Sequence, residues 1–342
     1  MKNKLQIFLL GMLMLCILLA YMGCAKDETT VGPQNPNTDP NAPTYPVTVT
    51  VLGPSGAPQG GVIVTLQNPP KVDSIFSAIT NSLGKATLQA PAGQQVLIAT
   101  IGVFQSTITV TVNASTTGNI ISAPIKLVQN TALGKTLVIF AGCEHIEEVL
   151  ADSAIGYTAF DTTSIEYMRA RVVADSAALL TYLKQYTIVF SDCNCGDEYG
   201  YPKLARLYGR YVQQGGNIYG GHYNYMNLQY IFPGYYTTGS SGYGDSLKII
   251  NTNLSSVLGY SVIYWSTGWY SPYMDLPANS VVYAVESGTT GSASSPQGVP
   301  IIVENHVGTG KYVYTTYHNQ DILNNADTRL KGIVRYFLYN MK

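Results

Sequence analysis

Charged side chains are scarce in this chain of 342 residues: Asp, Glu, Lys and Arg together make up 11% of it, and the formal net charge is -1. Without an excess of Lys and Arg there is no basic field of the kind that nucleic-acid binding requires. Histidine is also rare, with four residues, and cysteine occurs five times. The sequence therefore predicts no nucleic-acid partner, and few residues are left that could act as catalysts, disulfides or metal ligands.

The amino terminus has a positively charged start followed by a long apolar run. Lys2 and Lys4 precede residues 5–22, which are almost entirely apolar, and the chain becomes polar directly after Cys24. This order of charge and hydropathy is typical of an export signal. The segment around Cys24 resembles the lipobox of bacterial lipoproteins. The resemblance implies that residues 1–23 are a signal peptide and that Cys24 carries acyl groups.

Acyl groups on Cys24 would anchor the protein firmly through membrane lipid, because each buried methylene adds about 0.8 kcal/mol of membrane affinity. An uncleaved signal anchor is the alternative, since the apolar run is just long enough to span a bilayer. Both alternatives place the protein in the cell envelope, tethered to a membrane and facing outside the cytoplasm. The residue after the cysteine is Ala25 and not Asp, which resembles the pattern of lipoproteins that Gram-negative bacteria sort to the outer membrane.

A linker and a β-rich domain come next. Residues 24–46 are rich in Pro and Asn and should stay extended. Residues 47–128 show period-two alternation with β-branched residues and regular Gly, Pro and Asn breaks, which predicts an all-β sandwich of immunoglobulin or transthyretin type. The segments GPSGAPQGG at 53–61 and TNSLGKATLQAPAGQQVLIA at 80–99 resemble carboxypeptidase regulatory-like domains, which implies a non-catalytic spacer.

From residue 135 to residue 342 the pattern changes to strands alternating with helices. Continuous apolar strands alternating with amphipathic helices predict a parallel sheet covered on both faces, in a flavodoxin-like three-layer α/β domain. The predicted strands are 137–141, 187–190, 217–220, 299–304 and 311–316, and the predicted helices are 172–183, one that starts at Pro202 and one that ends near Met341.

Two segments of this domain carry a family resemblance. Residues 211–222 read YVQQGGNIYGGH and residues 308–318 read GTGKYVYTTYH. Both are similar to ThuA-like proteins, a branch of the class I glutamine amidotransferase-like superfamily. The resemblance implies a sugar-like ligand. The position of the superfamily's cysteine nucleophile holds His222, which implies that the usual route of glutamine hydrolysis is absent.

Polar and titratable residues gather just beyond the ends of the predicted parallel strands. Ligands of open α/β sheets bind outside these carboxyl ends, where the strand order reverses. We expect the segments after the first two strands to converge there. If the domain is an enzyme, the candidates for acid–base catalysis are His222, His145, Asp192, Glu144 and His318. The alternative is that the histidines only cap strand ends.

The remaining cysteines of the mature chain are Cys143, Cys193 and Cys195. In an oxidising compartment they predict a disulfide from Cys143 to one of the other two. Zinc held by these thiolates and His145 is the alternative, because the set offers four tetrahedral ligands. We expect no metal and no cofactor.

Aromatic residues are concentrated in residues 199–273, which contain fifteen of the 27 tyrosines and both tryptophans. Rigid aromatic rings in a setting of Gly, Ser and Asn are typical of contact surfaces. A tyrosine-rich edge of the core is the alternative. The candidate ligand-binding residues are Tyr223, Tyr225, Trp265 and Trp269.

The sequence as a whole favours a membrane-anchored lipoprotein whose α/β domain binds a carbohydrate or another polar ligand without catalysis. A glycoside-acting enzyme that uses the histidines and carboxylates is one alternative. A structural or adhesive protein of the cell envelope is the other.

Overall fold

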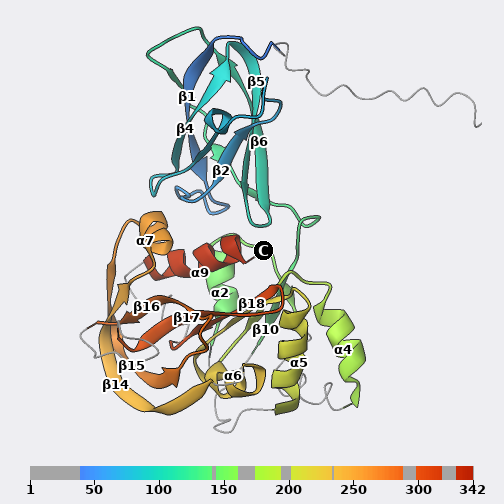
Figure 1. The fold of residues 1–342 in the computed structure, drawn as a ribbon, viewed down its shortest axis with the longest axis vertical. Coiled ribbons are helices and arrows are strands. Elements are labelled where there is room, and N and C mark those ends of the chain that lie inside the picture. Colours follow the sequence, from blue (N-terminus) through green and yellow to red (C-terminus); the bar gives the residue numbers. More distant parts are fainter. Residues whose placement is uncertain are drawn as a thin grey trace, which may run out of the picture.

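A β-rich part and an α/β part follow each other along the chain in the computed structural model (Figure 1). Cys24, Cys143, Cys195 and His318 lie outside the described residues, together with the predicted signal peptide. None of the helices in the described ranges is long and apolar enough to cross a bilayer. The structure describes residues 39–140, 144–160, 174–193, 202–232, 235–287, 298–317 and 329–341.

The β-rich part consists of two sheets. In one sheet the strand order is β4-β1-β7 with β8 also paired to β1, and in the other it is β3-β2-β5-β6-β9. Alternate residues of β1, such as Val47, Val49 and Val51, are fully buried, as the period-two pattern predicts. The elements are β1 (Thr44–Leu52), β2 (Ile63–Leu66), η1 (Ser74–Phe76), β3 (Ser77–Ile79), β4 (Lys85–Pro91), β5 (Gly93–Ile101), β6 (Phe104–Val112), β7 (Asn119–Ile120), β8 (Ile125–Lys126) and β9 (Val128–Gln129).

The α/β part alternates strands and helices up to α6 and then continues with antiparallel strands. Its elements are β10 (Thr136–Ile139), α2 (Ile146–Asp152), β11 (Thr158–Ala159), α4 (Ser176–Leu183), β12 (Ile188–Ser191), α5 (Pro202–Gln213), β13 (Asn217–Gly220), η2 (His222–Asn224), α6 (Tyr225–Ile231), β14 (Tyr236–Ile249), α7 (Thr252–Leu258), β15 (Val262–Asp275), β16 (Val281–Glu286), β17 (Pro300–Val307), β18 (Gly310–Thr315) and α9 (Arg329–Asn340).

Within the described residues these strands form one nine-stranded sheet with the order β11-β10-β12-β13-β18-β17-β16-β14-β15. Neighbours from β11 to β18 are parallel, and neighbours from β18 to β15 are antiparallel. The prediction of a parallel sheet is therefore right for the first five strands in this order, but the whole sheet is mixed, because β17, β16, β14 and β15 pair antiparallel. A tight turn joins β17 directly to β18, and such short connections permit only antiparallel pairing.

Helices cover both faces of the parallel half of the sheet (Figure 1). Val138 and Phe190 point to the face that packs against α2 and α9, whereas Leu137 and Val189 point to the face that packs against α4, α5 and α6. Successive residues of a strand point to opposite faces, so a strand covered on both sides must be apolar throughout. This requirement explains the continuous apolar runs from which β10 and β12 were predicted.

The β-rich part packs directly on α9, the last helix of the chain (Figure 1). The rings of Phe104 and Tyr339 meet edge to face with their centroids 4.9 Å apart. Gly102 has φ +54°, and a side chain there would collide with the backbone of Tyr339. Buried residues of the two parts belong to one continuous apolar cluster, so the junction is a packed interface.

Candidate functional site

The carboxyl ends of three neighbouring parallel strands bring polar residues together. Glu144 follows β10, Asp192 and Cys193 follow β12, and Gly221 and His222 follow β13. The strands pair in the order β10-β12-β13. All five residues are buried. We call Glu144, Asp192, Cys193 and His222 the strand-end cluster.

The Glu144 carboxylate contacts the backbone after both β12 and β13. Its Oε2 accepts a short hydrogen bond from the backbone N–H of Cys193. It also lies against the backbone at Gly221, where a Cβ atom would overlap both carboxylate oxygens. Glycine at this position is therefore what allows the carboxylate to approach the turn after β13.

Cys193 and His222 lie side by side. The Sγ atom of Cys193 is 3.9 Å from Nδ1 of His222, and both side chains are buried. A thiol next to an imidazole can transfer a proton to it, and an imidazole can in turn donate to or accept from a ligand hydroxyl. The cluster thus contains a buried carboxylate, a buried imidazole and a buried thiol.

Asn224 holds the turns that carry these side chains. Its Nδ2 donates to the carbonyl oxygens of Ser191 and Asp192, at 3.0 Å each. Its Oδ1 accepts from the Tyr312 hydroxyl at 3.4 Å. Because Asn224 lies two residues after His222, these bonds tie the turn after β13 to the end of β12.

Two buried tyrosines border the cluster on the face of α9. The hydroxyls of Tyr219 and Tyr317 are 3.4 Å apart. Burial raises the pKa of both phenols well above the ordinary value of 10, and the negative charge of Glu144 raises these pKa values further. Both hydroxyls are therefore protonated at neutral pH and can donate hydrogen bonds near the carboxylate.

The side chain of His145 is partly exposed, unlike those of Glu144, Asp192 and His222, the other predicted acid–base residues that the structure describes. His145 precedes α2, its side chain is 40% exposed, and its Nδ1 lies 3.0 Å from Oε1 of Glu147. The ligand atoms of His145, Glu147 and Glu148 lie within 4.8 Å of one another, which makes them the metal-binding candidates among the described residues. They share only His145 with the set considered from sequence as the zinc alternative, of which Cys143 and Cys195 lie outside the described residues. The predicted disulfide stays a prediction for the same reason.

The four aromatic residues predicted to bind a ligand lie on three different elements, η2, α6 and β15. Tyr225 is buried in the apolar cluster between α5 and the sheet. Trp265 and Trp269 belong to β15, and Tyr223 belongs to η2; their side chains lie outside what the structure describes. Tyr208, Tyr211 and Tyr219 are fully buried, so this part of the tyrosine-rich stretch is core.

No protein-family model matches the chain. No curated protein matches it either. Among solved structures, a protein described as ThuA-like from Bacteroides uniformis is 11% identical, with a TM-score of 0.38 over 60% of this chain and 91% of that chain. Two cytoplasmic proteins from Salmonella typhimurium are each 11% identical. One has a TM-score of 0.38 over 61% of this chain and 100% of that one. The other has a TM-score of 0.39 over 86% and 99%.

These solved structures resemble the chain only in the arrangement of its mixed α/β elements, at identities and scores that carry no argument about activity. Of the residues of this site, Glu144, Asp192, Cys193 and His222 were selected from sequence because they follow strands. Gly221 and Asn224 were missed, although both lie within two residues of His222 and follow the same strand.

Proposed function

We propose that the α/β domain binds a small polar ligand of carbohydrate type at the strand-end cluster. The observation that carries this proposal is the convergence of Glu144, Cys193 and His222 from three adjacent strands. In this sheet β11 lies on one side of β10 and the later strands β12 and β13 lie on the other. The strand order therefore reverses beside β10. Ligands of open α/β sheets bind at such a reversal.

Carbohydrate is the ligand class that this set of groups fits. A sugar hydroxyl both donates and accepts hydrogen bonds, and the Glu144 carboxylate, the His222 imidazole and the Tyr317 phenol supply both acceptors and donors. The similarity of residues 211–222 and 308–318 to ThuA-like proteins points to the same class. Binding without catalysis is favoured because the turn that holds the superfamily's nucleophile has His222 in its place.

The proposal extends to the wider architecture. The parallel strand order β11-β10-β12-β13-β18 supports a flavodoxin-like domain. The two sheets of residues 44–129 support a sandwich of carboxypeptidase regulatory-like type. We further propose that Cys24 is lipidated and holds the protein on the outer side of a membrane, in a Gram-negative bacterium the outer membrane.

Calorimetric titration of the full-length protein with a panel of mono- and disaccharides tests the binding proposal. We expect at least one sugar to bind, and we expect His222→Ala and Glu144→Gln to weaken its affinity at least tenfold. His306→Ala is the matched control, because His306 is 40% exposed and lies on β17 beside Glu304. Absence of binding across the panel, or equal loss in the control, would contradict the proposal and favour a structural or adhesive role.

A glycoside-acting enzyme is the second candidate, and the Cys193–His222 contact is the observation that favours it. An imidazole that exchanges a proton with a neighbouring thiol is suited to acid–base chemistry near neutral pH. Release of nitrophenol from aryl glycosides by the wild type, abolished in His222→Ala, would establish turnover. If the protein binds the sugars and releases no nitrophenol, the binding role stands alone.

The mass of the intact mature protein tests the anchor. We expect a mass that corresponds to residues 24–342 with acyl groups on Cys24. A mass equal to the unmodified full chain would show an uncleaved anchor instead.

A further inference from the structure

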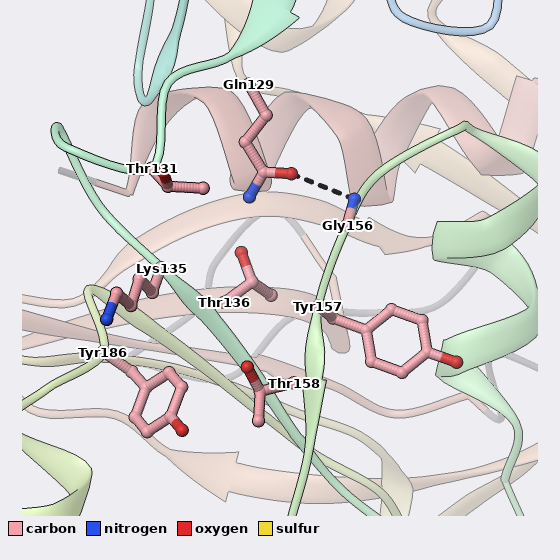
Figure 2. A pocket seen from close by; sticks show the side chains of 8 residues that line it. All are labelled: Gln129, Thr131, Lys135, Thr136, Gly156, Tyr157, Thr158 and Tyr186. Carbon is pink, nitrogen blue, oxygen red and sulfur yellow. Dashed lines mark hydrogen bonds between the residues drawn. The ribbon is translucent and has the colours of Figure 1, made fainter.

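A pocket lies at the ends of the same strands opposite to the strand-end cluster. It has a volume of about 420 Å³ and is bordered by the residues at the amino ends of β10, β11 and β12 and by the segment that leaves β9 (Figure 2). Its size falls in the range of small-molecule sites, which are frequent at domain junctions. The lining residues are Gln129, Thr131, Lys135, Thr136, Gly156, Tyr157, Thr158 and Tyr186.

The lining is rich in hydrogen-bond donors, and no carboxylate occurs among its described residues. Lys135 contributes an ammonium group, and within the described part of the chain no ion pair engages it. Gln129 accepts the N–H of Gly156 at 2.9 Å through Oε1, which leaves its amide NH₂ group as a donor toward the pocket (Figure 2). Together with three threonine hydroxyls, these groups present positive charge and donors to whatever occupies the space.

The buried hydroxyl of Thr136 is a second observation that points to a ligand in this pocket. Its side chain is 2% exposed, and Oγ1 has no hydrogen-bond partner among the described residues. Figure 2 shows this oxygen directed toward the space bounded by Gln129 and Thr131. A buried hydroxyl without a partner destabilises the fold, and a ligand that reaches the floor of the pocket would satisfy it.

We propose that this pocket binds a small ring compound that carries a carboxylate, such as an acidic monosaccharide. The carboxylate would pair with Lys135, and the ring hydroxyls would bond to the threonines and to the Gln129 amide. Tyr157 and Tyr186 offer aromatic surface for the ring. A neutral sugar fits less well, because it carries no negative charge to pair with the Lys135 ammonium group. The site is distinct from the strand-end cluster, since parallel strands place their amino and carboxyl ends at opposite edges.

Calorimetric titration of the full-length protein with glucuronate, and with glucose as the neutral counterpart, tests this site. We expect glucuronate to bind at least tenfold more tightly than glucose. Lys135→Met removes the charge and keeps most of the side-chain volume, and Thr136→Val removes the hydroxyl and keeps the β-branched shape. Each should weaken glucuronate binding at least tenfold, whereas Lys184→Met, an exposed lysine at the end of α4, should not.

Thermal unfolding without ligand separates a binding defect from a folding defect. The midpoint of Thr136→Val should equal or exceed that of the wild type, because the substitution removes a buried hydroxyl that has no partner. The result does not depend on the strand-end proposal, because Lys135 and Thr136 lie at the opposite ends of the strands. The proposal is wrong if wild-type protein gives no heat with glucuronate at millimolar concentration, or if Lys135→Met and Thr136→Val both bind it as well as the wild type.

Discussion

Gly221 shows how a single missing side chain shapes the strand-end cluster. The Glu144 carboxylate occupies the place where a Cβ of residue 221 would lie. A larger residue would force either the carboxylate or the turn after β13 to move, and with it the bond from Cys193 to Glu144. Gly221 does not have a positive φ, so its backbone conformation does not require glycine. The requirement for glycine therefore comes from the nearby carboxylate.

Gly221→Ala should lower the free energy of unfolding by roughly 1 to 3 kcal/mol, the usual cost of forcing extra atoms into a packed site. Denaturant unfolding measures it. Gly209→Ala is the control, because Gly209 lies inside α5 and an added Cβ would only touch Ile231 at an ordinary 3.4 Å. That variant should be neutral or up to about 1 kcal/mol more stable, since alanine favours helix over glycine. Equal behaviour of the two variants would contradict the steric account.

Sequence reasoning found the residues of the cluster that carry charge or titrate, because such residues stand out directly after an apolar strand. Asn224 and Gly221 have no such signal, since asparagine and glycine are common in every turn. Their roles depend on which strands are neighbours, and that order is set by packing across the whole sheet. The tyrosines illustrate the converse, because a residue type typical of contact surfaces fills the core at Tyr208 and Tyr211.

At the scale of elements, α9 is the helix on which both parts of the molecule meet. Tyr339 lies near its end, 2% exposed, with its ring against Phe104 and its backbone against Gly102. Its hydroxyl has no hydrogen-bond partner among the described residues. The ring therefore carries the contribution of this residue to the junction.

Tyr339→Ala should lower the free energy of unfolding by about 3 to 5 kcal/mol, the range for removing a buried aromatic ring. Tyr339→Phe keeps the ring and should cost nothing or stabilise the protein slightly, because it removes a hydroxyl without a partner. Calorimetric unfolding of the two variants checks this pair. A large loss in Tyr339→Phe would show that the hydroxyl matters and would contradict the packing argument.

Elements with a strong local pattern were predicted well. The predicted strand 217–220 coincides with β13, and the predicted helix start at Pro202 is the first residue of α5. The long strands β14 and β15 were missed, because their Gly, Ser and Tyr residues show no alternation of apolar and polar side chains. Their pairing also contains three register shifts, which break any period-two signal.

At the scale of the whole molecule, the buried tyrosines make stability depend on alkaline pH. Burial raises the pKa of Tyr339 from 10 to about 12, and burial likewise raises the pKa values of Tyr219, Tyr312 and Tyr314. Between the unfolded and folded pKa values the unfolded chain loses protons that the folded chain keeps. Stability is therefore fully present below about pH 10 and falls as the pH rises above it.

We expect the free energy of unfolding to fall steeply above about pH 10, with tyrosinate absorbance appearing together with loss of structure. Tyr339→Phe should make the fall shallower, by about 2 to 3 kcal/mol at pH 12, since one pKa unit corresponds to about 1.4 kcal/mol. Denaturant titrations from pH 8 to about pH 12 measure both effects. Titration of all tyrosines near pH 10 in a protein that stays folded would contradict the burial argument.

The position of β1 in its sheet decides how the molecule would respond to mechanical load. A tether on the amino-terminal side would pull at Thr44, along the axis of a strand that is paired to β4 over seven residues and to β7 and β8 on its other edge. Because the bonds of the antiparallel β1–β4 ladder run perpendicular to the strands, a force along β1 loads them together instead of opening them one at a time. A protein pulled at this end would hold its fold under tension until the whole strand slid free.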